Sequence, residues 1–139
     1  MKTSSVKMIF FALLAIIIVS LSSCTTKVQF LNSSVVPAAR GTVQISSDAN
    51  RNYAIKMKLY DLAGPERLTP PRSNYVVWLV SADNKARNIG QVIISSTLTA
   101  NFEAVSSFKP SKIMITAEDE ANVTYPSGTE IVLTTGYLR

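Results

Sequence analysis

The feature that most constrains the fold is an alternation of apolar and polar side chains that persists after residue 40, without a convincing helical stripe. It is clearest over residues 53–62, where Lys56 and Lys58 fall on one side and Tyr53, Ile55, Met57 and Leu59 fall on the other. Successive side chains of a β-strand point to opposite faces. A strand with one buried and one hydrated face is typical of an antiparallel sheet. The chain is therefore expected to consist of antiparallel strands, with both lysines in solvent.

Turn-forming residues divide the rest of the alternating region into short strands. We expect these strands at residues 42–46, 75–80, 88–95, 98–104, 112–118 and 130–135, with a short first strand at 28–31. About seven or eight strands with turns every ~8–12 residues predict an all-β, antiparallel two-sheet sandwich of the immunoglobulin-like type. A small β-barrel is the alternative. The expected core includes Trp78, Tyr75, Ile55, Met57, Leu59, Ile113, Ile115 and Val132.

The N-terminal segment has the layout of a secretory signal peptide. Lys2 and Lys7 precede an apolar run over residues 8–19, and small residues follow it. Leu21-Ser22-Ser23-Cys24 resembles the lipobox of bacterial lipoproteins, which implies cleavage before Cys24 and attachment of diacylglyceryl and palmitate-type acyl chains to this residue. Two or more acyl chains anchor a protein stably to a membrane. An uncleaved anchor is the alternative, although the apolar run is shorter than the roughly 18–20 residues that span a bilayer.

The leader gives an expected organisation and location. Residues 1–23 are the signal peptide, residues 24–40 a lipidated N-terminus and flexible tether, and residues 41–139 the sandwich domain. Because the basic start of the leader stays inside the cell, the domain is expected outside the cytoplasm. No aspartate follows Cys24 as an inner-membrane retention signal, which favours the outer membrane. The membrane, reached through the lipid on Cys24, is therefore an expected partner.

Composition excludes several classes of function. Removing residues 1–23 from the 139 leaves 116 residues with 12 basic and 9 acidic side chains, and the basic ones are scattered singly. This pattern does not indicate a nucleic-acid-binding protein. The chain has no histidine, and Cys24 is its only cysteine. Histidine-based catalysis, zinc sites of the usual type and disulfides are therefore not expected. We expect no catalytic residues and no cofactor other than the covalent lipid.

Three groups of residues are candidates for ligand or catalytic sites. Glu118, Asp119 and Glu120 are weak candidates for calcium ligands, but they lack the spacing of a dedicated calcium loop, and three adjacent acids are more often simply solvated. Glu103 and Glu130 are the candidate carboxylate pair for glycoside hydrolysis, but nothing in the sequence brings them together. A sugar-stacking surface is the alternative to ordinary strand positions for five tyrosines, namely Tyr53, Tyr60, Tyr75, Tyr125 and Tyr137.

Several strand motifs, in the same order, resemble the C-terminal extracytoplasmic domain of the anti-sigma-K factor family. They are Tyr75-Val76-Val77-Trp78-Leu79-Val80, Asn88-Ile89-Gly90-Gln91-Val92, Ile113-Met114-Ile115-Thr116-Ala117-Glu118 and Pro126-Ser127-Gly128-Thr129-Glu130-Ile131-Val132-Leu133. The likeness covers about residues 53–136. The family's Glu-Pro-x-Gly-Gly loop is replaced by Glu118-Asp119-Glu120-Ala121-Asn122, and the sigma-binding domain has no counterpart. The resemblance implies the fold and an extracytoplasmic location, without sigma-factor binding.

These observations favour a non-enzymatic envelope lipoprotein whose sandwich is a protein-interaction or sensor module with an envelope protein as partner. The alternative is a small-ligand or carbohydrate-binding lipoprotein of an uptake system. The sequence leaves the oligomeric state and the identity of the partner open.

Overall fold

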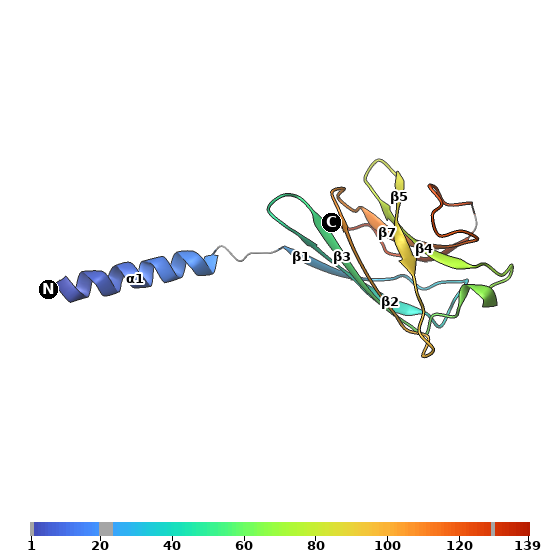
Figure 1. Cartoon of the computed structure of the whole chain (residues 1–139), viewed down its shortest axis with the longest axis horizontal. Coiled ribbons are helices and arrows are strands. Elements are labelled where there is room, and N and C mark those ends of the chain that lie inside the picture. The colour runs from blue at the N-terminus through green and yellow to red at the C-terminus, as the bar shows by residue number, and fades with distance from the viewer. Residues whose placement is uncertain (1, 20–23, 129) are drawn as a thin grey trace.

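The computed structural model describes residues 2–19, 24–128 and 130–139. The Leu21-Ser22-Ser23 part of the lipobox-like motif and Thr129 lie outside these residues. Figure 1 shows helix α1 (Lys2–Val19) and a β-sandwich formed by the described residues from Cys24 onward. Within the described ranges, no helix combines the length and the apolar character that crossing a bilayer requires.

The described part of the chain contains eight strands in two antiparallel four-stranded sheets. The first sheet has the order β1-β2-β3-β6, and the second has the order β5-β4-β7-β8. The strands are β1 (Thr25–Gln29), β2 (Arg40–Ser47), β3 (Tyr53–Tyr60), β4 (Asn74–Val80), β5 (Ala86–Val92), β6 (Ala100–Ser106), β7 (Lys112–Glu118) and β8 (Ile131–Thr134), and a short 3-10 helix, η1 (Pro65–Arg67), precedes β4. The chain crosses between the sheets after β3, β5 and β6, as immunoglobulin-like sandwiches do. The predicted two-sheet sandwich is confirmed, and the strands do not close into the alternative barrel.

The main core lies between the two sheets. From β3 it receives Ile55, Met57 and Leu59, which are buried, while Lys56 and Lys58 on the same strand are exposed. The alternation in the sequence therefore gives this strand the expected inner and outer faces. All eight residues expected in the core are buried: Trp78, Tyr75, Ile55, Met57, Leu59, Ile113, Ile115 and Val132. Both hydrophobic clusters consist of residues that follow Cys24, so the described core needs no residue of the leader.

Trp78 belongs to a second cluster, on the outward face of the second sheet. Alternation along β4 turns Tyr75 toward the main core and Val76, Trp78 and Val80 away from it. These outward side chains are nevertheless buried, because Met114 of β7 and Val123 of the following loop pack over them. Both faces of β4 are thus covered, which explains why its sequence is almost continuously apolar.

The flexible tether expected over residues 24–40 is corrected by the structure. β1 begins at Thr25 and pairs with β2 along its whole length, from Thr25 opposite Ser46 to Gln29 opposite Thr42. After β1 the chain buries Phe30, Val36 and Ala39 against the main core. Backbone hydrogen bonds and apolar burial therefore make this segment part of the sandwich. The small polar residues between these buried positions lie on the outside of the sandwich. Because they dominate the composition of the segment, the sequence resembles a flexible tether.

Several strand limits differ from expectation, most clearly those of β1 and β5. The first strand covers Thr25–Gln29 rather than residues 28–31, and β5 covers Ala86–Val92 rather than residues 88–95. Residues after Val92 leave the sheet and form a turn, in which Ser95 and Thr99 bond each other through backbone and side chains. Turn formation by Ser and Thr here outweighs the strand preference of Ile93 and Ile94.

Candidate functional site

The strand directions give the sandwich two distinct ends. The basal end contains Cys24, the turns at residues 48–52, 81–85 and 107–111, and the C-terminal residues 135–139. The distal end contains the connections at residues 30–39, 61–73, 93–99 and 119–130. In Figure 1 the C-terminus and the β2–β3 turn lie on the side from which α1 extends, and η1 lies on the opposite side.

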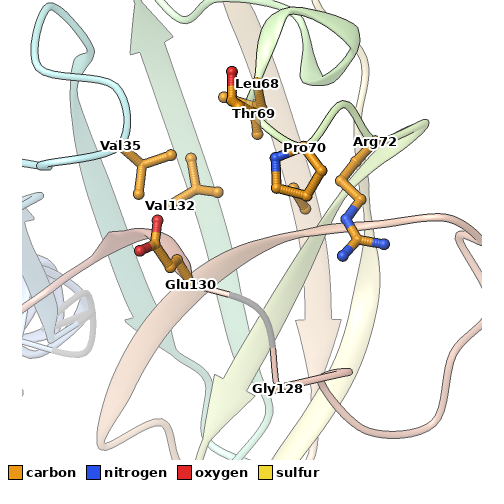
Figure 2. A pocket seen from close by; sticks show the side chains of 9 residues that line it. Val35, Leu68, Thr69, Pro70, Arg72, Gly128, Glu130 and Val132 are labelled. Carbon is orange, nitrogen blue, oxygen red and sulfur yellow. The ribbon is translucent and has the colours of Figure 1, made fainter.

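A hollow of about 310 Å³ opens at the distal end, and it is the candidate binding site. Its walls come from three connections and the ends of β7 and β8, and Figure 2 shows Glu130 and Arg72 on two sides of Val132 and Pro70. Its lining residues are Val35, Leu68, Thr69, Pro70, Arg72, Ala117, Gly128, Glu130 and Val132. The volume is at the low end of the ~300–1,000 Å³ typical of small-molecule sites. An apolar floor with one cation and one anion at its sides suits a small apolar group that carries a polar substituent.

The β7–β8 loop, which the structure describes at residues 119–128 and 130, forms one wall of the hollow. Side chains from other parts of the sandwich hold it in place. The guanidinium of Arg72 donates to the carboxylate of Asp119 at 2.7 Å. The side-chain amide of Asn74 donates to the Asp119 carbonyl at 3.0 Å, and that of Asn88 donates to the carbonyls of Ala121 and Val123 at 2.9 and 2.8 Å. These contacts join the loop to β4, β5 and the segment before β4. The first part of the loop, residues 119–123, is therefore held in place before a ligand binds, which reduces the entropy that binding must overcome.

A chain of buried polar groups supports the same loop from below. The indole N–H of Trp78 donates to the hydroxyl of Thr116 at 2.8 Å, and this hydroxyl donates to Oε1 of Glu118 at 2.6 Å. The same carboxylate oxygen accepts from the backbone N–H of Ser127 at 3.2 Å. Glu118 is thus a buried carboxylate that accepts hydrogen bonds from a strand neighbour and from the far part of the loop. Buried charged groups are tolerated when they are hydrogen-bonded in this way.

The three acids proposed as calcium ligands are not brought together. Glu118 is buried beside Thr116, Asp119 pairs with Arg72, and Glu120 is exposed. Across the described ranges, no group of three His, Cys, Asp or Glu side chains is arranged to hold a metal ion. The three acids therefore do not form a shared ligand set, because the carboxylates of Glu118 and Asp119 have protein partners in different directions.

The carboxylate pair and the five tyrosines are not brought together either. Glu103 lies on the outer face of the first sheet, 3.8 Å from Lys56, whereas Glu130 lies at the distal end beside the second sheet. Of the five tyrosines, Tyr75 is in the core and donates its hydroxyl to the Ala63 carbonyl at 2.7 Å. The remaining four lie at the two ends of β3, in the β7–β8 loop and near the C-terminus, namely Tyr53, Tyr60, Tyr125 and Tyr137. Neither a carboxylate pair nor a five-tyrosine surface is formed.

Cys24, the expected lipidation residue, is exposed and directly precedes β1. Its carbonyl accepts a hydrogen bond from the Ser47 N–H at 3.4 Å, so the backbone at this position is already part of the first sheet. A second hollow, of about 200 Å³, lies beside Cys24 at the basal end. The side chain on which a lipid would be carried therefore lies at the opposite end of the sandwich from the distal hollow.

Sequence reasoning missed the role of Asn88 and Gly90. The β4–β5 register shifts between Val77 and Trp78, because β5 has one additional residue, Ile89, at this point; the adjacent Gly90 has φ +138°. A Cβ at Gly90 would lie 2.9 Å from the Phe102 ring. The bulge accompanies the placement of Asn88 on the outer face, where it reaches the β7–β8 loop, and Asn88 also accepts from the Gly90 N–H at 3.0 Å. The Asn-x-Gly spacing was the available signal, because glycine within a strand often marks a bulge.

Comparison with known proteins gives no relative: the chain matches no protein-family model and no curated protein sequence.

Proposed function

We propose that the chain is a non-enzymatic lipoprotein of the bacterial cell envelope, anchored to the outer membrane through a lipid on Cys24. Its sandwich acts outside the cytoplasm as an interaction or sensor module for an envelope protein. The distal hollow and the β7–β8 loop form the recognition site. The resemblance to the extracytoplasmic domain of anti-sigma-K factors supports this type of module.

The observation that carries the proposal is the position of Cys24 relative to the distal hollow. The residue is exposed at the basal end, and the hollow opens at the other end. A lipid on Cys24 thus leaves the hollow unobstructed by the membrane. The contacts that hold the first part of the β7–β8 loop in place support a binding role, and the absence of histidine from the sequence argues against the commonest acid–base chemistry.

Anchoring is tested by metabolic labelling with palmitate. The full chain is expected to incorporate the label, and Cys24→Ala is expected to abolish it and leave the protein soluble or as precursor. Ser47→Ala is a matched control, because this neighbouring position carries no thiol. Equal labelling of the wild type and Cys24→Ala contradicts the proposed anchor.

Recognition is tested by placing a photo-crosslinking amino acid at Thr69, which is exposed at the edge of the hollow. A discrete protein adduct is expected in intact cells, and it should weaken when Arg72→Ala removes the cation of the site. The same crosslinker at Lys58, on the outer face of the first sheet, is the control. Equal adducts from both positions contradict recognition at the distal hollow.

A small-ligand or carbohydrate-binding lipoprotein of an uptake system is the second candidate, and the apolar floor of the distal hollow favours it. In that case Thr69 gives no protein adduct. Native mass spectrometry of protein purified from the envelope then shows a retained small molecule, and Arg72→Ala loses it. The two candidates therefore differ in whether the mass added at the hollow is that of a protein or of a small molecule.

A further inference from the structure

Charge is distributed very unevenly between the two ends of the sandwich. The basal end and the adjoining strand starts carry six basic and two acidic side chains, a net of +4: Arg51, Lys85, Arg87, Lys109, Lys112 and Arg139 against Asp48 and Asp83. The distal end carries six acidic and three basic side chains, a net of −3: Asp61, Glu66, Glu118, Asp119, Glu120 and Glu130 against Arg40, Arg67 and Arg72. The positive charge of the domain is thus concentrated around Cys24.

Most of this basal charge is not neutralised within the protein. Among the ion pairs of the described residues, none involves Arg51, Lys109, Lys112 or Arg139. The carboxylates of the two basal acids accept hydrogen bonds within their own turns. Asp48 accepts from the N–H groups of Asn50 and Asn52, and Asp83 accepts from the Ser81 hydroxyl. The basal cations are therefore available to an anionic surface outside the protein.

The hollow beside Cys24 adds shape to this charge. Its walls are largely apolar, and the cations Lys109 and Arg139 are part of its lining. The apolar lining residues are Ile45, Tyr53, Pro110 and Leu138. A hollow of this kind matches a phospholipid headgroup, because two cations can face the phosphate while the apolar walls contact the glycerol and the first methylenes.

Two exposed aromatic residues lie at the same end and contact basic side chains. The Phe108 ring is stacked under the Arg87 guanidinium at 3.8 Å, and the Tyr137 ring lies 5.6 Å from the Lys112 ammonium. Aromatic residues next to lysine and arginine are typical of surfaces that lie in the headgroup region of a membrane.

We propose that the basal end binds the anionic headgroups of glycerophospholipids, with Lys109 and Arg139 facing the phosphate in the hollow beside Cys24. This inference rests on the proposed function, since the lipid on Cys24 is what brings the basal end to the membrane. Complementary charge and continuity with Cys24 make an anionic bilayer the occupant. The distal end, with its negative charge, is repelled by the same surface. The headgroup contact thus orients the domain as well as adding affinity.

The test uses the sandwich from residue 24 with Cys24→Ser, so that the anchor makes no contribution. Its binding to vesicles of phosphatidylglycerol mixed with phosphatidylcholine is compared with binding to phosphatidylcholine alone. Binding is expected only to the anionic vesicles and is expected to weaken with added salt. Lys109→Gln together with Arg139→Gln is expected to lower the partition coefficient by about 25-fold, at about fivefold for each side chain.

The control removes two charges from another surface. Lys56→Gln together with Lys58→Gln changes two exposed positions on the outer face of the first sheet and is expected to alter partitioning by less than about twofold. Equal losses from both pairs would show attraction by net charge alone and would overturn the basal site. Binding that does not distinguish anionic from zwitterionic vesicles would overturn it too.

Orientation provides a second readout. In the Cys24→Ser background, an environment-sensitive fluorophore on Ser107→Cys at the basal end should shift to the blue on anionic vesicles. The same label on Thr124→Cys at the distal end should not. Similar shifts at both positions contradict the proposal. These results do not depend on palmitate labelling of the full chain, so failure of the headgroup contact and failure of the anchor are observed separately.

Discussion

Replacing Thr116 by valine tests the buried hydrogen-bond chain that supports the β7–β8 loop. Valine has nearly the same shape as threonine, so Thr116→Val leaves no cavity and removes only the hydroxyl. The indole N–H of Trp78 then loses its 2.8 Å acceptor, and Oε1 of Glu118 loses its 2.6 Å donor. Both groups are in buried residues that cannot turn to water without opening the loop.

The expected cost follows from those two losses. A buried donor left without a partner costs about 1–3 kcal/mol, and a lost hydrogen bond to a charged group costs about 1.5–3 kcal/mol. Glu118 keeps the bond from the Ser127 N–H. We therefore expect Thr116→Val to lower the free energy of unfolding by about 3–5 kcal/mol. With a urea slope of about 1.5 kcal/mol/M, the unfolding midpoint falls by about 2–3 M.

The chain itself provides the probe, because Trp78 is its only tryptophan and lies next to the substituted residue. Urea unfolding followed by tryptophan fluorescence gives the midpoint. Thr124→Val, at an exposed loop position, is the matched control and should change stability by less than about 0.5 kcal/mol. Glu118→Gln keeps an acceptor oxygen at the same place and should cost less than Thr116→Val. A Thr116→Val loss no larger than that of the control would refute the supporting role of this hydroxyl.

Three further outcomes follow from the fold. Gly90→Ala should lower the free energy of unfolding by about 2 kcal/mol or more in urea melts, because the new Cβ combines a backbone φ of +138° with a close contact to the Phe102 ring. An unchanged midpoint would show that the bulge relaxes freely. Burial raises the pKa of Tyr75 to about 12, so the folded state holds this proton more tightly than the unfolded state. The contribution of Tyr75 to stability should therefore be constant below pH 10 and be lost between pH 10 and 12, a decline that Tyr75→Phe should reduce in alkaline unfolding measurements. Met57→Lys should cost several kcal/mol and Lys56→Gln less than about 0.5 kcal/mol, since only the former enters the core; similar midpoints would contradict the register of β3.

The sequence pattern was sufficient to predict structure where the burial of a side chain depends on the alternation within a single strand. The alternation in β3 predicts which of its side chains are buried, and the apolar run at residues 75–80 predicts the strand that the structure shows as β4. The pattern did not reveal what covers the outer face. Trp78 is buried because Val123, 45 positions later in the chain, folds back over it. A sequence period cannot encode such a long-range contact.

The candidate site was less predictable for the same reason. Asp119 and Glu118 are adjacent in the sequence, yet one pairs with Arg72 and the other accepts from Thr116. Adjacent residues of a strand point to opposite sides, so three consecutive acids at a strand end are a poor basis for a shared ligand site. The distal hollow is formed by connections from distant parts of the chain. Its existence depends on how the loops pack, which short motifs do not record.

The direct start of β1 at Thr25 also determines how far the protein can reach. If Cys24 is anchored, no free spacer separates the bilayer from the first strand. The eight residues of β3 extend about 25 Å at ~3.3 Å per residue, so the distal hollow is held at roughly that height above the lipid. An anchored domain of this kind could turn about the membrane normal, but no spacer would let it extend outward. A partner would then have to present its binding surface within the same thin layer, where confinement to two dimensions raises the effective concentration of both proteins.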